Sequence, residues 1–214
     1  MSIHPRFHGR GLYAITPGAH LSLASMVKAA LDGGAAMIQY RDLTDDSARR
    51  RQEAGNLATL CRAAGVPLII DHDITLAAAV GAAGVHLGSD DDDIAAVRAQ
   101  LGSDAIIGVS CYADAARAQS MAAAGADYVS FGAFHTSPTK PHAGIASMDV
   151  LEATRSLGIP RVAIGGITPD NGAHLIAAGA DMLAAVSSVF DADDVRAAAQ
   201  RFQHLFVSVQ ASSA

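Results

Sequence analysis

The strongest constraint on the fold of this chain is a pattern that recurs along its length: a short apolar run, a polar residue that ends it, and then an alanine-rich stretch of helical character. The apolar runs are continuous rather than alternating, which is typical of parallel strands buried on both faces. The predicted strands are Leu12–Thr16, Met37–Arg41, Leu68–Asp71, Val85–Leu87, Ile106–Ser110, Tyr128–Phe131, Val162–Ile164 and Met182–Val186.

The helical stretches lie between these strands and often stop at a glycine, such as Gly33, Gly65 or Gly125, which fits the left-handed position that follows a helix. The predicted helices are Leu21–Asp32, Ser47–Ala64, Ile74–Ala82, Asp93–Leu101, Asp114–Ala124, Met148–Leu157, Asn171–Ala178 and Asp194–Val207. Eight strand–helix units in 214 residues predict an α/β fold, a single-domain (β/α)₈ TIM barrel.

The predicted domain covers residues 1–214, with residues 1–10 as an N-terminal extension and residues 208–214 as a C-terminal tail. An open doubly wound sheet is the alternative architecture. The barrel is favoured because the unit count reaches eight and because no G-x-G-x-x-G motif opens the first helix.

Charge and cysteine content exclude several classes of protein. A net charge of -6 and a pI near 5.8 do not match a nucleic-acid-binding surface. Two cysteines, Cys61 and Cys111, make no disulfide framework, and the first ten residues lack an apolar segment. We therefore expect a cytoplasmic protein without a nucleic-acid or membrane partner. The sequence leaves the oligomeric state open, a homo-oligomer included.

Polar residues stand where the predicted strands end. In a (β/α)₈ barrel these ends form the active face, so the residues there are the candidates for function. They are Gln39, Arg41, Asp71, the aspartates at 90–93, Ser110, Ser137–Lys140, Gly165–Gly166 and Ser187–Ser188. The sequence therefore predicts a polar ring above an apolar barrel.

Lys140 is one of only two lysines in the chain, and it follows Ser137, Pro138 and Thr139. A proline at 138 disfavours a helix or a central strand, so the segment is predicted to be a loop. A compact ammonium group beside hydroxyl groups suits phosphate, and the planar fork of Arg41 suits phosphate oxygens as well. This side of the ring is predicted to bind an anion.

A second anion site is predicted after the last two strands. Gly165–Gly166 would let backbone N–H groups approach an anion, and the helix that follows Thr168 would favour negative charge at its beginning. Loops after the seventh and eighth strands of such barrels commonly bind phosphate, so Val186 and Ser187 belong to the same predicted site.

Four consecutive aspartates at 90–93 offer oxygen ligands for Mg²⁺. They also fit the beginning of the following helix as an N-cap and as partners of its dipole, and that role would account for most of the four.

Six short stretches carry a resemblance to a known family, and together they span most of the chain. They are Gln39-Tyr40-Arg41, Gly84-Val85-His86-Leu87-Gly88, Ile107-Gly108-Val109-Ser110, Gly125-Ala126-Asp127-Tyr128, Ser137-Pro138-Thr139-Lys140 and Ala163-Ile164-Gly165-Gly166-Ile167. With them the sequence resembles the thiamine phosphate synthase family, which belongs to a superfamily shared with the thiazole tautomerases.

This resemblance implies a Mg²⁺-dependent transferase that joins hydroxymethylpyrimidine diphosphate to hydroxyethylthiazole phosphate and releases pyrophosphate. Arg41, Ser110 and Lys140 would be catalytic, and Asp91 and His72 would be the metal-site residues. The implied substrate-binding residues are Gln39, Arg41, Ser110 and Lys140 for the pyrimidine diphosphate, and Ser137, Thr139, Gly166, Val186 and Ser187 for the thiazole phosphate. Tyr40 and Asp71 are implied to bind substrate as well, without assignment to one of the two.

Three positions depart from the family pattern. Leu43 replaces a lysine, Asp71-His72 replaces an Asn-Asp pair, and Phe134-His135-Thr136 replaces Phe-Phe-Pro. Imidazole suits zinc better than it suits magnesium. Three hypotheses therefore stay open: the synthase, a thiazole tautomerase-like isomerase that uses His72 or His135 as an acid or base, and a non-catalytic relative that binds phosphate ligands.

Overall fold

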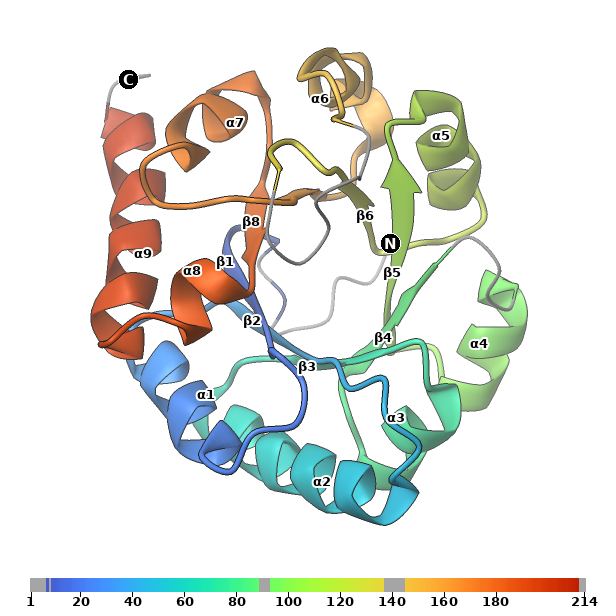
Figure 1. Ribbon diagram of the computed structural model, residues 1–214. Helices are drawn as coiled ribbons and strands as arrows, with labels where there is room; N and C mark the ends of the chain where they lie inside the picture. Colours follow the sequence, from blue (N-terminus) through green and yellow to red (C-terminus); the bar gives the residue numbers. More distant parts are fainter. Residues whose placement is uncertain (1–6, 8, 89–92, 137–144, 212–214) are drawn as a thin grey trace.

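The computed structural model describes residues 7, 9–88, 93–136 and 145–211. Its strands are all parallel and pair in chain order, and the last strand pairs with the first, so they close a barrel surrounded by helices (Figure 1). This closure confirms the predicted single-domain TIM barrel and excludes the open sheet. The strands are β1 (Gly11–Ile15), β2 (Met37–Tyr40), β3 (Leu68–Asp71), β4 (Gly84–Leu87), β5 (Ile106–Tyr112), β6 (Tyr128–Phe131), β7 (Arg161–Ile164) and β8 (Met182–Ala185).

The helices agree with the predicted ones in order and approximate position. They are α1 (Leu23–Asp32), α2 (Ser47–Ala64), α3 (Ile74–Val80), α4 (Ile94–Leu101), α5 (Ala115–Ala123), α6 (Asp149–Ala153) followed by the 3₁₀ turn η1 (Arg155–Leu157), α7 (Gly172–Ala178), α8 (Ser187–Phe190) and α9 (Val195–Ala211). The short helix α8 was not predicted, because four residues are too few to show a helical period. No helix among these residues has the length and apolar character needed to cross a membrane.

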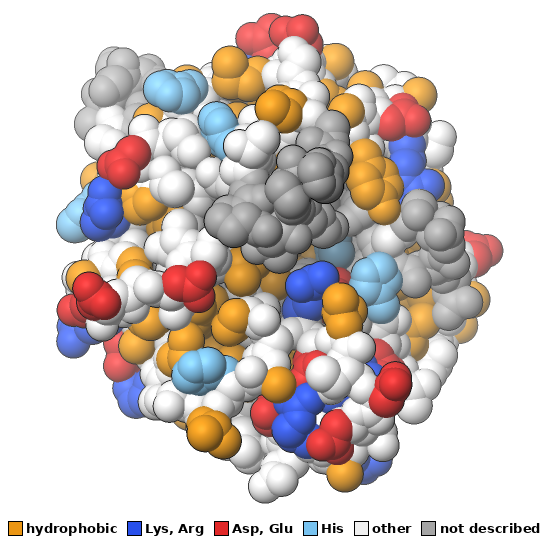
Figure 2. All heavy atoms as spheres, in the orientation of Figure 1, with side chains coloured by type: hydrophobic (Ala, Val, Ile, Leu, Met, Phe, Trp, Pro, Cys, Tyr) orange, Lys and Arg blue, Asp and Glu red, His pale blue; other side chains and the backbone are white. Residues whose placement is uncertain are grey.

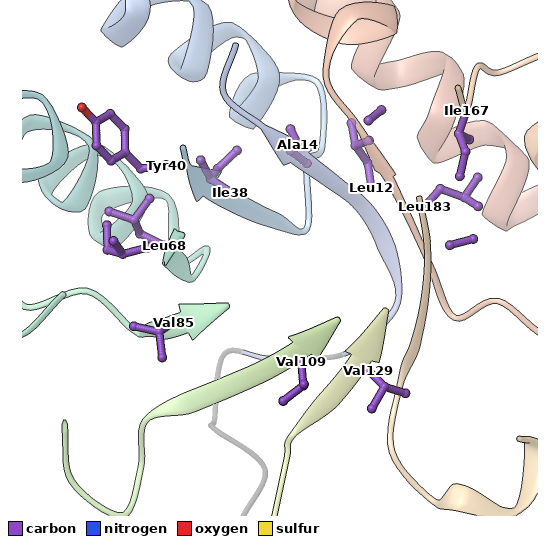
Figure 3. Close-up of a cluster of buried hydrophobic side chains, with 14 of the residues drawn as sticks. Leu12, Ala14, Ile38, Tyr40, Leu68, Val85, Val109, Val129, Ile167 and Leu183 are labelled. Atoms are coloured by element: carbon purple, nitrogen blue, oxygen red, sulfur yellow. The ribbon is translucent and has the colours of Figure 1, made fainter. Parts of the chain in front are cut away.

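Side chains along each strand alternate between the inside of the barrel and the surrounding helix layer. On β2, Met37 belongs to the inner cluster of buried side chains, whereas Ile38 and Tyr40 belong to the outer cluster. Figure 3 shows outer side chains such as Leu12, Ile38 and Val85. This alternation decides which of the predicted site residues can reach the barrel interior, because a strand has a side-chain period of two.

Phe7 belongs to the inner cluster although it lies within the predicted N-terminal extension. It is 4% exposed, and its ring centroid lies 5.9 Å from that of Tyr128. The same cluster holds Met37 and Ile106, which begin β2 and β5, so Phe7 fills the end of the barrel where the strands start. The segment before β1 is thus part of the core at this residue.

We expect Phe7→Ala to lower the free energy of unfolding by about 3–5 kcal/mol, because truncating a buried aromatic side chain removes apolar contacts and leaves a cavity. Urea denaturation followed by circular dichroism measures this. Leu21→Ala is the control, because Leu21 is fully exposed and its truncation should change stability by no more than about 0.5 kcal/mol. Equal, small effects of the two substitutions would show that Phe7 is not part of the core.

Candidate active site

The carboxyl ends of β2 and β3 bring three of the predicted site residues together. The Nε of Arg41 lies 3.4 Å from Oδ2 of Asp71, and Nε2 of His72 lies 3.5 Å from Oδ1 of the same carboxylate. Figure 2 shows basic and acidic side chains mingled around these strand ends and the beginning of α2. The Asp71 side chain is only 8% exposed, so it is a nearly buried anion between two nitrogen groups.

His72 has a left-handed backbone with a φ of 60°, a conformation that histidine adopts more readily than most residues. Its backbone N–H donates to the carbonyl oxygen of His86 over 3.0 Å, and its imidazole is half-exposed at the barrel rim. The ring is therefore partly exposed to solvent at the mouth of the barrel, beside Asp71.

Thr16, just beyond β1, holds the backbone of Arg41. The N–H of Arg41 donates to Oγ1 of Thr16 over 2.9 Å, and that hydroxyl donates to the carbonyl oxygen of Arg41 over 3.2 Å. Thr16 is completely buried. The backbone of Arg41 is therefore held by Thr16, and its guanidinium group is oriented by Asp71.

Tyr40 points away from the barrel interior, into the helix layer. Its phenol donates to Oε2 of Glu53 on α2 over 2.8 Å and lies 3.4 Å from Oδ2 of Asp42. Although burial raises the pKa of Asp42, hydrogen bonds from Thr44 and Arg49 outweigh it and hold that pKa below its ordinary value. The geometry gives Tyr40 the role of anchoring β2 to α2, so we leave it out of the proposed binding site.

A chain of four hydrogen bonds runs through the barrel interior from Gln39 to Ser110. The Gln39 amide donates to the Tyr13 phenol over 2.7 Å, the phenols of Tyr13 and Tyr128 lie 2.8 Å apart, and the Tyr128 phenol lies 3.0 Å from Nδ1 of His86. His86 Nε2 lies 3.0 Å from Oγ of Ser110. The chain thus links two predicted site residues that stand on β2 and β5.

Sequence reasoning missed Tyr13, His86 and Tyr128, because each lies inside a run that is otherwise apolar. His86 stood within a stretch that carries the family resemblance, and each of the three occupies an inward position of its strand. A test of the period-two alternation on each strand could have found them. Gly108 makes room for the chain, because a Cβ at that position would overlap the Tyr128 ring.

The loop between β7 and α7 is locked in place on the far side of the ring. Asn171 accepts the N–H of Thr168 over 2.9 Å through Oδ1 and donates to the carbonyl oxygen of Gly166 over 3.0 Å through Nδ2. The hydroxyl of Ser188, in α8, donates to the carbonyl oxygen of Ile167 over 2.7 Å. Gly166 is therefore tied to the segment that carries the other two predicted phosphate residues, Val186 and Ser187.

Gly165 and Gly166 have φ angles of 101° and 60°, which favour glycine. A Cβ at Gly166 would lie 2.5 Å from the carbonyl oxygen of Thr136 and 2.8 Å from Cβ of His135. The N–H of His135 donates to the carbonyl oxygen of Gly165 over 3.0 Å. Close packing against the loop after β6 is thus one reason for glycine here, and it holds whether or not an anion binds.

Four predicted site residues, Asp91, Ser137, Thr139 and Lys140, lie outside the described residues. Within the described parts of the chain, no group of three or more His, Cys, Asp and Glu side chains is placed to hold a metal ion. Asp71 is a carboxylate at the rim, and Mg²⁺ is commonly held by one or two protein carboxylates together with phosphate oxygens of a substrate. The described residues therefore fit a magnesium ion that a bound diphosphate would share.

Comparison with known proteins agrees with this arrangement. The family model described as thiamine monophosphate synthase matches residues 12–189. The thiamine-phosphate synthase of Acidithiobacillus ferrooxidans is 51% identical over 204 residues, which are 92% of this chain and 94% of that protein. The thiamine-phosphate synthase of Azoarcus sp. is 51% identical over 200 residues, covering 92% and 97% of the two chains.

A solved structure titled thiamine phosphate pyrophosphorylase, from Pyrococcus furiosus, superposes with a TM-score of 0.85 at 31% sequence identity and covers 95% of this chain and 98% of that one. The region that the family model matches includes the β7–α7 loop and all of the barrel strands apart from Gly11, the first residue of β1. By sequence and by structure, the chain belongs to the thiamine monophosphate synthase family.

Proposed function

We propose that this chain is a thiamine-phosphate synthase, a transferase that joins hydroxymethylpyrimidine diphosphate to hydroxyethylthiazole phosphate and releases pyrophosphate. The observation that carries this proposal is the 51% identity to a thiamine-phosphate synthase across 92% of the chain. In the reaction, the bond between the pyrimidine methylene carbon and the diphosphate oxygen breaks, and its electron pair leaves with pyrophosphate. The lone pair of the thiazole nitrogen then forms the new carbon–nitrogen bond.

The pyrimidine diphosphate is assigned to the side of the ring that carries Arg41 and Ser110. Arg41 has a fixed backbone and an oriented guanidinium group, which suits two oxygen atoms of a phosphate. The Ser110 hydroxyl is the last group of the buried series of hydrogen bonds that starts at Gln39. Lys140 is assigned to the same diphosphate from the sequence alone. Groups that are already oriented favour a transition state in which negative charge builds up on pyrophosphate.

Magnesium is proposed as the cofactor. Asp71 would supply an oxygen ligand at the rim, and Asp91 is assigned as its partner from the sequence. When bound, the ion would supply positive charge that neutralises the diphosphate. His72 stands at a metal position of the family, but its imidazole nitrogen is a poorer ligand for magnesium than a carboxylate oxygen is.

The thiazole phosphate is assigned to the opposite side, at Gly166, Val186 and Ser187, with Ser137 and Thr139 assigned from the sequence. The hydrogen bonds of Asn171 and Ser188 support this assignment, because they hold the β7–α7 loop against α8. A short helix after the eighth strand is a frequent component of phosphate sites in such barrels.

A thiazole tautomerase-like isomerase is the second candidate. It is favoured by His135, which is half-buried and donates its backbone N–H to the carbonyl oxygen of Gly165, beside the assigned thiazole phosphate site. A histidine there could transfer a proton to or from a thiazole ring. Such a protein would make no thiamine phosphate from the two synthase substrates.

We expect thiamine phosphate to form from the two substrates only when Mg²⁺ is present, and we expect Lys140→Ala to lower kcat/KM at least about 100-fold, because a positioned cation stabilises departing pyrophosphate. Lys28→Ala is the matched control. Lys28 is the other lysine, and it pairs with Asp32 on the exposed face of α1 at 2.6 Å. Absence of product with folded protein at any Mg²⁺ concentration would overturn the proposed function, and equal rates of the two variants would remove Lys140 from the mechanism.

The double variant Asp71→Asn/His72→Asp restores the family's residues at the metal position. We expect it to raise turnover at limiting Mg²⁺, because a carboxylate oxygen replaces the imidazole at position 72 while the amide at position 71 still offers an oxygen ligand, and because aspartate also tolerates the left-handed backbone of position 72. Adding Leu43→Lys should raise turnover further by returning a cation, although effects at one shared site need not add. Steady-state rates across a magnesium titration measure both, and no gain in either variant would show that these positions do not limit the reaction.

We expect Gly166→Ala to raise the KM for the thiazole phosphate, because the added Cβ would displace the backbone at positions 135 and 136 beside the assigned phosphate site. The matched control is Gly65→Ala. Gly65 also has a positive φ, of 70°, but a Cβ there meets nothing within 4 Å. If both variants keep the KM of the unaltered protein, the phosphate is not bound at Gly166.

A further inference from the structure

In the buried series of hydrogen bonds that runs from Gln39 to Ser110, the phenols of Tyr13 and Tyr128 each carry one hydrogen. Burial raises the pKa of Tyr13 and of Tyr128, so both phenols keep their hydrogen at neutral pH. A phenol that accepts one hydrogen bond and has one remaining neighbour in the chain must donate to that neighbour. Fixing the direction of the first hydrogen bond therefore fixes the direction of every later one.

The first bond is donated by Gln39, whose Nε2 faces the Tyr13 phenol at 2.7 Å. Tyr13 then donates to the Tyr128 phenol at 2.8 Å, and Tyr128 donates to Nδ1 of His86 at 3.0 Å. Because Nδ1 accepts this hydrogen from Tyr128, the hydrogen that the imidazole can donate is on Nε2.

The last bond runs from His86 Nε2 to the Oγ of Ser110, at 3.0 Å. Because this oxygen accepts a hydrogen from His86, its own hydrogen is free to be donated elsewhere. Ser110 lies at the carboxyl end of β5 and is half-buried, so that direction is toward the mouth of the barrel.

We propose that His86 is a positioning residue that, with Tyr13 and Tyr128, sets Ser110 as a hydrogen-bond donor to the anionic diphosphate. This inference rests on the proposed function, because the diphosphate is the anion assigned to Ser110. The opposite direction would turn the Ser110 hydrogen toward His86 and present only lone pairs to an anion. A bound anion accepts from Ser110 and strengthens the same direction along the whole chain.

The packing around the chain keeps its members at these distances. The His86 ring stacks on the Tyr128 ring, with centroids 5.6 Å apart and an interplanar angle of 17°. The Tyr13 ring meets the Tyr128 ring edge-on, with an interplanar angle of 88°. Phe7 packs against Tyr128 from the closed end of the barrel. Tyr128 is thus fixed on three sides while its hydroxyl links two neighbours.

A double-mutant cycle tests whether His86 acts through Ser110. The amide nitrogen of glutamine can replace Nε2 of histidine, whereas that of asparagine replaces Nδ1. We expect His86→Asn to lower kcat/KM roughly 10- to 100-fold and His86→Gln to lower it less, because only glutamine can still donate to Ser110. In the Ser110→Ala background, His86→Asn should lower kcat/KM less than about 3-fold, because the hydroxyl that His86 would orient is already absent. Equal costs of His86→Asn in both backgrounds would overturn the proposal.

Nitrogen-15 NMR of histidine-labelled protein reads the position of the imidazole hydrogen directly and does not depend on any variant being active. The His86 ring is identified by its nuclear Overhauser contacts with the stacked Tyr128 ring. The proposal requires a hydrogen on Nε2, facing Ser110, both without ligand and with inorganic pyrophosphate bound. A hydrogen on Nδ1, which is the reversed chain, would overturn it.

Calorimetric binding of inorganic pyrophosphate in the presence of Mg²⁺ separates this inference from the proposed function. If the protein forms no thiamine phosphate but His86→Asn weakens pyrophosphate binding only when Ser110 is present, the function fails and the positioning role stands. If the protein forms thiamine phosphate and His86→Asn weakens pyrophosphate binding equally in both backgrounds, the function stands and the positioning role fails.

Discussion

The closed barrel imposes the constraint on which the rest of the structure depends: every second side chain of each strand must point into an interior that water does not fill. Near the strand starts this interior is apolar, with Phe7, Met37 and Ile106 among its members. Several side chains inside the barrel are polar, and a buried polar group without a partner costs about 1–3 kcal/mol. Five of these side chains meet that need by hydrogen-bonding to one another in the order Gln39, Tyr13, Tyr128, His86 and Ser110.

Charge at the rim follows a related rule. Arg41 directly follows β2, and its guanidinium group faces a carboxylate that is almost buried. Asp71 lowers the local positive charge but fixes the direction of Arg41. An incoming diphosphate and a magnesium ion would change the balance of charge around Asp71 and Arg41 without moving the backbone, which Thr16 holds. Orientation in advance of binding is what an electrostatic site requires.

The sequence predicted the barrel well, because continuous apolar runs and glycine-terminated helices are local signals that the fold does not override. It predicted Arg41, Asp71 and Ser110 at the rim because each ends an apolar run. It failed to separate Tyr40 from Gln39, since adjacent residues on a strand face opposite sides and only the register of the barrel decides which side is inside. Tyr40 bonds to Glu53 in the helix layer, and no pattern within β2 alone reveals that partner.

The missed side chains share one physical cause. Phe7, His86 and Tyr128 are brought together by closure of the barrel, which is a long-range event, whereas a sequence pattern reports local periodicity. Helix α8 is too short to have a period at all. The roles of Asp91 and Lys140 are assigned from the sequence and the family resemblance, because both residues lie outside the described part of the chain.

The central claim is that one anion site is shared by Arg41 and by the end of the buried chain at Ser110. A crystal structure with pyrophosphate and Mg²⁺ bound tests it most directly. The account predicts a pyrophosphate oxygen within hydrogen-bond distance of the Arg41 guanidinium group and another within that distance of the Ser110 hydroxyl, with Asp71 facing the metal ion. Pyrophosphate bound instead only at Gly166 and Ser187, away from both side chains, would contradict it.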